Sequence, residues 1–154
     1  MDVTHYRDVV GHFATGVAVV TAQTDDGPAG FTCQTFGSLS LSPVLITFSA
    51  FSGGHSWPRV RDVGVIAVSV LSEGQADVAR AFATTGVDKF ALAPWTPGPA
   101  GSPLLDGALA HLEGRIVGVT THGDHDQVVA TVEHAQAHPG RPLLYYRGGF
   151  AGAT

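Results

Sequence analysis

The segment 30–45, GFTCQTFGSLSLSPVL, decides the expected fold because it joins a polar cluster to two strand signals. Its first half places hydroxyl, thiol and amide groups at consecutive positions from Thr32 to Thr35. The run 38–42 then alternates serine with leucine, which in a β-strand puts the leucines on one face and the serines on the other. After Pro43, the apolar run 44–48 predicts a second strand. Such a surface suits a flat polar ligand, although a half-exposed strand of a purely structural barrel shows the same pattern.

Composition narrows the class of protein. A length of 154 residues predicts one domain, residues 1–154. The formal net charge of -5 argues against nucleic acid or an anionic membrane as the main partner. Cys33 is the sole cysteine, so an internal disulfide is impossible, and no apolar run approaches the length of a membrane span. We therefore expect a cytoplasmic protein, and its small charged fraction, 14%, suggests apolar surface buried in an oligomer.

Alternating and helical patterns predict a mainly β fold. Thr4 is the expected N-cap of a first helix, in which Tyr6, Val9, Val10 and Phe13 form one apolar stripe that should pack on the sheet. Strands are expected at 17–22, within 30–49, and at 65–71, 108–119, 128–134 and 143–146. These six or seven strands and two or three short helices contain no repeated βαβ unit, so an antiparallel β-barrel is expected.

The loop 52–58, SGGHSWP, leads into a short helix that Gly64 should end. A glycine-rich turn at a helix N-terminus presents unpaired N–H groups and predicts an anion site, although many such sites hold only water. Further along, the Ser72–Gln75 capping box opens another helix. The proline-rich excursion 84–106, which contains Asp88-Lys89-Phe90 and Trp95, is long enough to suggest that it covers a site or an interface.

Other chemistry is poorly supported by the sequence. His122, Asp124, His125 and Asp126 have ligand side chains but occupy one turn without separated further ligands, so we expect no metal site. A hydrogen-bonded turn or a contact with an organic ligand explains them equally well. Cys33 lies in an apolar strand, which tends to raise a thiol pKa and leave it inert. A nucleophile elbow, a Rossmann fingerprint and a P-loop are all absent.

Seven motifs in order resemble one known family. They are HFATGVAVVTA, GFTCQTFGSLSLSP, SVLSEGQADVARAFA, DKF, GSPLL, GDH and PLLYYRG, spread from about residue 5 to residue 150. Together they resemble the short flavin reductases, the reductase partners of two-component flavin monooxygenases. The resemblance implies a split β-barrel homodimer with FMN or FAD near the dimer interface. It also implies hydride transfer from NADH or NADPH to the flavin, which then diffuses in reduced form to a monooxygenase.

The resemblance also implies where the flavin binds. Reduction places negative charge on the N1–C2=O side of the flavin ring, where fixed N–H and hydroxyl donors stabilise it. The implied positions are Thr32, Cys33, Gln34 and Thr35 along the ring edge, Ser38 and Ser40 in the same pocket, and Ser52, His55 and Ser56 around the phosphate.

On the nicotinamide side, the resemblance implies His125, preceded by Asp124 in the GDH motif. Hydride transfer needs no acid or base, so His125 is expected to position the dinucleotide, with nicotinamide C4 within roughly 3–3.5 Å of flavin N5. Tyr146 is a weaker candidate for cofactor contact, as is Phe90, and both are better suited to packing.

Departures from the family pattern leave the ligands open. His55 stands where Arg or Lys is usual, Gln34 replaces asparagine, and Ala130 replaces a common glycine. A histidine is largely neutral at pH 7, so phosphate affinity and the choice between FMN and FAD stay undecided. NADPH would need a cation for its 2′-phosphate, from Arg59, Arg61, Arg80 or Arg147. Two alternatives remain: a flavin-binding protein with no reductase activity, and an enzyme that retains FMN to reduce another substrate.

Overall fold

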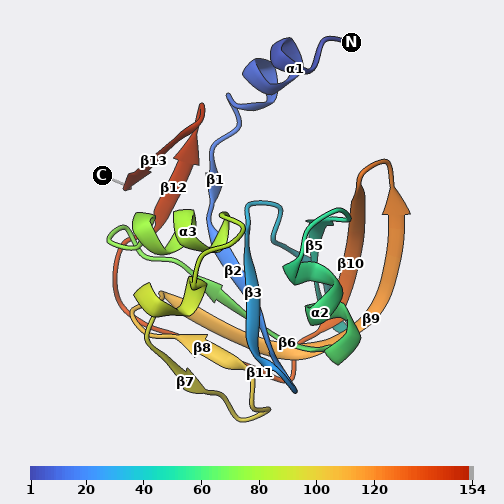
Figure 1. Cartoon of the computed structure of the whole chain (residues 1–154), viewed down its shortest axis with the longest axis vertical. Helices are drawn as coiled ribbons and strands as arrows, with labels where there is room; N and C mark the ends of the chain where they lie inside the picture. The colour runs from blue at the N-terminus through green and yellow to red at the C-terminus, as the bar shows by residue number, and fades with distance from the viewer. Residues whose placement is uncertain (153–154) are drawn as a thin grey trace.

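The computed structural model describes residues 1–152 and consists mainly of antiparallel β-strands with short peripheral helices (Figure 1). The helices are α1 (Val3–Val10), α2 (Ser56–Val63) and α3 (Ala76–Phe82), with a 3₁₀ segment η1 (Lys89–Leu92). The strands are β1 (Thr15–Gly16), β2 (Ala18–Thr24), β3 (Gly27–Cys33), β4 (Gly37–Leu41), β5 (Val44–Phe51), β6 (Val65–Val70), β7 (Trp95–Pro97), β8 (Pro103–Leu105), β9 (Ala110–His122), β10 (His125–Thr131), β11 (His134–Ala137), β12 (Leu143–Tyr146) and β13 (Gly149–Gly152). The expected mainly β, antiparallel class is confirmed. The strand number exceeds six or seven because several short strands, such as β1 and β7, carry no sequence pattern long enough to recognise. Within the described part of the chain, no helix is long and apolar enough to cross a membrane.

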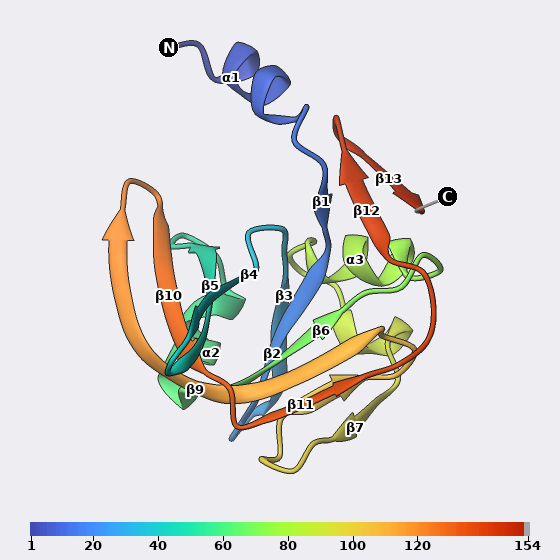
Figure 2. The ribbon, with the colours of Figure 1, turned by 180° about the vertical axis from the view of Figure 1, so that it is seen from behind.

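One large sheet forms the body of the molecule, in the order β3-β2-β6-β9-β10-β5-β4, with β11 also paired to β9. The long strand β9 joins its two halves, because residues 110–115 pair with β6 and residues 116–122 pair with β10 (Figure 2). Gly114 lies in this strand where a Cβ atom would collide with the backbone carbonyl of Thr131. The hydrogen-bonded ladder does not close between its end strands, β3 and β4, among the described residues.

Two apolar clusters hold the sheet and helices together. In the first, Trp57 of α2 packs edge-on against Phe48 and Phe31, with ring centroids 6.1 Å apart in both pairs. In the second, Phe82 of α3 packs among buried side chains of the other sheet half, including Val19, Leu71, Leu105 and Leu143. Helices α2 and α3 are therefore each anchored by a buried aromatic residue, and both adjoin β3.

Helix α1 differs from the expectation. It begins after Asp2, whose Oδ1 atom accepts a hydrogen bond from the His5 N–H, and Thr4 is not the cap. The expected packing on the sheet is wrong for the described chain, because α1 stands away from it (Figures 1 and 2) and contains no buried residue. Val9 is 56% exposed and Phe13 beyond the helix is 78% exposed. An apolar stripe shows that a helix needs an apolar partner, but not that the partner belongs to the same chain.

The strand β4 also differs from the simple alternating pattern. Its pairing with β5 shifts register between Ser38 and Ser40, which disturbs the expected alternation of faces. As a result Leu39 and Leu41 do not enter the core, and Leu41 is 85% exposed. Since β4 is an end strand of the sheet, this edge presents apolar side chains on the surface of the single chain.

Candidate functional site

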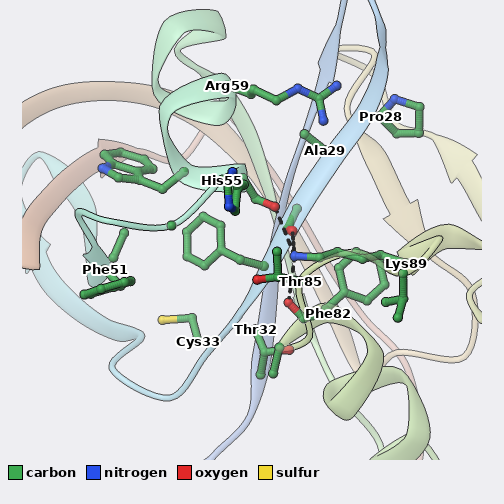
Figure 3. Close-up of a pocket in the computed structure, with 18 of the residues that line it drawn as sticks. Pro28, Ala29, Thr32, Cys33, Phe51, His55, Arg59, Phe82, Thr85 and Lys89 are labelled. Carbon is green, nitrogen blue, oxygen red and sulfur yellow. Dashed lines mark hydrogen bonds between the residues drawn. The ribbon is translucent and has the colours of Figure 1, made fainter.

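A cavity of about 640 Å³ opens between β3, the N-terminus of α2 and the segment that follows α3 (Figure 3). Eight of the residues considered from the sequence line it: Thr32, Cys33, Gln34, Thr35, His55, Ser56, His125 and, of the two weaker candidates, Phe90. The structure thus brings together residues that are up to 93 positions apart in the chain (from 32 to 125). The other five expected residues, Ser38, Ser40, Ser52, Asp124 and Tyr146, lie outside the lining of this cavity.

The polar wall at the end of β3 is held by hydrogen bonds inside the protein. The Thr32 hydroxyl donates to the carbonyl of Ala79 at 2.6 Å. The Thr35 hydroxyl oxygen accepts a 2.7 Å hydrogen bond from the Ser49 N–H and lies 3.2 Å from Cys33 Sγ. Burial raises the pKa of the Cys33 thiol, in line with the expected inert role. Thr32, Cys33 and Thr35 therefore shape the wall.

Gln34 differs from its neighbours because its side chain is exposed and forms no hydrogen bond within residues 1–152. Its amide offers both donors and an acceptor to a ligand in the cavity. Phe51, at the end of β5, also lines the cavity and is half exposed, so it presents an aromatic surface to a ligand ring. Together these two side chains fit the edge and the face of a flat polar heterocycle.

The first turn of α2 forms the opposite side of the cavity. His55 occupies the N-cap position, and its side chain forms no capping hydrogen bond in the described structure. The N–H groups of Ser56 and Trp57 have no acceptor inside the helix by geometry, and Pro58 has no N–H at all. Gly64, with φ of 76°, ends the helix as expected. The positive end of α2 therefore faces the cavity and suits an anionic group.

Two cations line the cavity besides the expected flavin contacts. Lys89 was not identified from the sequence as a site residue, and Arg59 was only one of four arginines considered for the 2′-phosphate of NADPH. Lys89 Nζ hydrogen-bonds to Gly30 O, Phe82 O and Ser56 Oγ. Arg59 lies one turn beyond His55 in α2 and contacts Thr24 Oγ1 at 3.2 Å. The DKF motif and the length of the 84–106 excursion were the available signals for Lys89, whereas an arginine in a helix carries no comparable signal.

His125 enters from the turn between β9 and β10. Its Nδ1 atom lies 2.8 Å from Asp124 Oδ1, and this hydrogen bond is the main reason why the pKa of Asp124 is lowered. The imidazole centroid lies 5.9 Å from that of Phe51. Asp124 therefore acts on the cavity through His125, although Asp124 itself lies outside the lining.

A buried carboxylate ties these parts together. Asp126 Oδ2 accepts a 2.8 Å hydrogen bond from Trp57 Nε1, and Oδ1 accepts from Thr121 Oγ1 at 2.7 Å and from Ser52 Oγ at 3.3 Å. The hydrogen bond from Trp57, followed by that from Thr121, lowers the pKa of Asp126. Because the donors belong to α2, β9 and the loop after β5, Asp126 sets the position of His125 relative to α2. Ser52 thus points its hydroxyl at this carboxylate.

The remaining expected residues lie on other surfaces. Ser38 and Ser40 are on the edge strand β4, and Tyr146 is an exposed residue of β12. Within residues 1–152, no group of three or more histidine, cysteine or acidic side chains is placed to hold a metal ion. Of the polar turn 122–126, Asp126 points inward and Asp124 pairs with His125.

This arrangement defines a class of protein: an antiparallel β fold with a cavity lined both by polar and aromatic side chains, Gln34 and Phe51, and by cationic groups at the N-terminus of α2. Such a cavity suits a ring system with a phosphate tail, as in nucleotide cofactors. Residues 10–154 match the family model described as flavin reductase like domain. The chain belongs to this family, so the resemblance expected from the sequence is confirmed, and it is an enzyme of the flavin reductase class.

Several relatives and solved structures are similar over nearly the whole chain. The reductase subunit HsaB of a flavin-dependent monooxygenase from Mycobacterium tuberculosis is 40% identical, over 99% of this chain and 83% of the relative. The FMN reductase (NADH) SmoA from Agrobacterium fabrum is 36% identical, over 94% of this chain and 83% of the relative. The NADH:FAD oxidoreductase SgcE6 from Streptomyces globisporus, solved with NAD and FAD fragments, has a TM-score of 0.91 and 38% identity, covering 97% of this chain and 92% of that one.

Proposed function

We propose that this protein is an NAD(P)H:flavin oxidoreductase that transfers a hydride from NADH or NADPH to FMN or FAD and releases reduced flavin to a partner monooxygenase. The observation that carries the proposal is the single cavity in which Gln34 and Phe51, the first turn of α2, and His125 all meet. Relatives named as an FMN reductase using NADH and as a monooxygenase reductase subunit support it.

The lining residues support one orientation of the flavin in the cavity. Its ring would lie along the segment 32–35, with the Gln34 amide at its polar edge and Phe51 beside it. Its phosphate would lie at the N-terminus of α2, near His55 and Ser56. Bound there, the flavin supplies the electron-accepting ring, and the protein supplies orientation and electrostatic stabilisation.

His125 would hold the nicotinamide. A carboxylate can only accept a hydrogen bond, so the contact with Asp124 places the imidazole proton on Nδ1. In the neutral ring, Nε2 is then a hydrogen-bond acceptor, which suits the amide N–H₂ of the nicotinamide carboxamide. His125 moves no proton in this account, and its contribution is the orientation of the hydride donor.

Arg59 is the candidate cation for a second phosphate. Of the four arginines considered from the sequence, it alone lines the cavity in the described structure. Arg61 lies 3.7 Å from Asp126, Arg80 pairs with Asp77, and Arg147 lies 3.6 Å from Asp8. Arg59 has no carboxylate partner within residues 1–152, so its guanidinium can bind the 2′-phosphate of NADPH or the second phosphate of FAD.

The proposed assembly is a homodimer of a single catalytic domain, residues 1–154. The exposed apolar face of α1 and the apolar edge of β4 support it, since such surfaces on one chain usually become covered. A second copy of the chain is the proposed occupant, in keeping with the expected interface. A cytoplasmic location is proposed because the single buried thiol, Cys33, forms no disulfide there.

Steady-state kinetics test the function. NADH oxidation at 340 nm is followed with catalytic enzyme and FMN, then FAD, then no flavin. Turnover that saturates with added flavin is expected. Binding of flavin without turnover on NADH or NADPH would instead indicate a flavin-binding protein with no reductase activity. A purified protein that stays yellow and needs no added flavin would indicate an enzyme that retains its cofactor.

A further inference from the structure

Lys89, the only lysine of the chain, is surrounded by three oxygen atoms of the protein (Figure 3). Its Nζ atom lies 3.1 Å from the carbonyl oxygen of Gly30, 3.0 Å from that of Phe82 and 3.0 Å from Ser56 Oγ. An ammonium group has three N–H donors and no acceptor. These three contacts match its three donors, so Lys89 has no further proton to offer a ligand.

The contact with Ser56 fixes the direction of a hydroxyl group. Because an ammonium can only donate, Ser56 Oγ must be the acceptor in this hydrogen bond. The hydroxyl proton of Ser56 therefore points away from Lys89, and no acceptor for it lies within residues 1–152. Ser56 also lines the cavity at the N-terminus of α2. A hydroxyl that accepts from a cation is in turn a stronger donor.

We propose that Lys89 is a positioning residue that holds the Ser56 hydroxyl as a donor aimed into the cavity, where it binds the phosphate group of the flavin. This inference rests on the proposed flavin phosphate site. It assigns to the DKF motif a role that acts through Ser56, with no direct contact between Lys89 and the ligand.

The charges around Lys89 agree with this role. The carbonyl of Phe82 belongs to the C-terminal end of α3, where the helix dipole favours a cation. Asp88 also lines the cavity but forms no ion pair with Lys89 in the described structure. His55 and Arg59 add basic groups on the same side. Burial lowers the pKa of Lys89, and a bound phosphate would favour its charged form.

Removal of the ammonium would release the Ser56 hydroxyl. In Lys89→Met, the carbonyls of Gly30 and Phe82 lose their donor, and an unsatisfied buried carbonyl is costly. No cation would then hold the Ser56 proton in the direction of the ligand, and the hydroxyl would rotate freely. FMN, which carries a phosphate, should lose affinity, whereas riboflavin, which has none, should bind nearly as before.

The test compares the dissociation constants of FMN and riboflavin, by flavin fluorescence quenching, for the full chain and five variants. Ser56→Ala, Lys89→Met, Lys89→Gln and the double variant Ser56→Ala/Lys89→Met probe the pair, and Arg115→Met is the control. Arg115 is an exposed arginine of β9 that pairs with Glu133, away from the cavity lining. Thermal unfolding and near-UV circular dichroism identify any variant that has not folded, and Lys89→Gln then replaces Lys89→Met.

Ser56→Ala and Lys89→Met should each raise the dissociation constant of FMN about tenfold relative to that of riboflavin. The double variant should bind FMN no more weakly than Ser56→Ala. Additive losses in the double variant, or equal losses of FMN and riboflavin in Lys89→Met, would overturn the positioning role. If Ser56→Ala has no selective effect on FMN, the phosphate site itself is wrong and the inference falls with it. Flavin-dependent NADH oxidation, measured separately, shows whether the reductase function survives that outcome.

Discussion

The Nδ1 atom of His125 lies 2.8 Å from Oδ1 of Asp124, and because a carboxylate only accepts hydrogen bonds, this contact places a proton on Nδ1. The pair is formed by consecutive residues in the turn between β9 and β10, next to the exposed ring of Phe51. Because the hydrogen bond orients the imidazole ring before any ligand binds, binding loses less conformational entropy of this side chain.

His125→Ala should raise the KM for NADH about tenfold and leave the dissociation constant of FMN nearly unchanged. The physical reason is the loss of one oriented acceptor on the nicotinamide side. His122→Ala is the matched control, since His122 lies in the same hairpin and outside the cavity lining. An equal loss of NADH and FMN binding would contradict the role assigned to His125.

His55→Ala should weaken the binding of FMN several-fold more than the binding of riboflavin, because only FMN has a phosphate for the basic group to contact. The measurement is fluorescence quenching of each flavin at one pH and one salt concentration. His12→Ala, a change of an exposed histidine between α1 and β1, serves as the control. Equal weakening of both flavins would show that His55 does not contact the phosphate.

Arg59→Ala should reduce selectivity for a ligand with a second phosphate by about tenfold. Two comparisons in the same kinetic experiment distinguish the two phosphates. One is the ratio of kcat/KM for NADPH to that for NADH, and the other is the same ratio for FAD and FMN. A change in the first assigns Arg59 to the 2′-phosphate, and a change in the second assigns it to the pyrophosphate of FAD. If both ratios stay as in the wild type, Arg59 recognises neither group.

Asp126 makes stability depend on pH in a defined window. Its pKa is lowered in the folded protein, chiefly by the hydrogen bond from Trp57. The stabilisation is therefore complete above the ordinary carboxyl pKa of about 4 and disappears as the pH falls below that value, through the lower folded pKa. Trp57→Phe should lose less stability than the wild type between pH 5 and pH 3, as measured by urea unfolding. Parallel curves for the two proteins would refute this.

Val9→Asp should prevent dimer formation if the apolar face of α1 meets a second chain. A charge placed in a buried apolar interface is strongly unfavourable. Light scattering after size-exclusion chromatography should give about twice the mass of the 15.9 kDa chain for the wild type and the mass of one chain for the variant. Gln23→Asp, at an exposed position of β2, is the control. A wild-type protein that is monomeric at micromolar concentration would contradict the proposed homodimer.

The local patterns were sufficient for much of the fold. Features such as Gly64 after α2, a turn within the polar segment 122–126 and the apolar runs of β5 and β6 depend on neighbouring residues, so the sequence predicts them well. The register shift in β4 depends on its partner strand β5, and no local pattern shows it. The apolar face of α1 was recognised from the sequence, but its expected packing on the sheet was wrong, because α1 contains no buried residue.

The site shows the same division. Eight of the residues that the resemblance suggested line the cavity. Lys89 was not among them, and Arg59 was considered only as one of four arginines for the 2′-phosphate of NADPH. Lys89 contacts Gly30, 59 positions away, and Arg59 contacts Thr24, 35 positions away, so neither contact follows from a local pattern. Ser52 was expected near the phosphate from the resemblance, and no local pattern shows that its hydroxyl donates to Asp126, 74 positions further along the chain.

Anaerobic mixing of NADH with a large excess of FMN over enzyme shows whether the protein reduces flavin and releases it. Without oxygen, reduced FMN accumulates, and the loss of flavin absorbance near 450 nm measures its amount. Each enzyme molecule should reduce many FMN molecules, one for each NADH oxidised, and His125→Ala should slow this reduction at low NADH concentration. Reduction that stops after one flavin per enzyme, or no reduction with either NADH or NADPH, would contradict a reductase that releases its flavin.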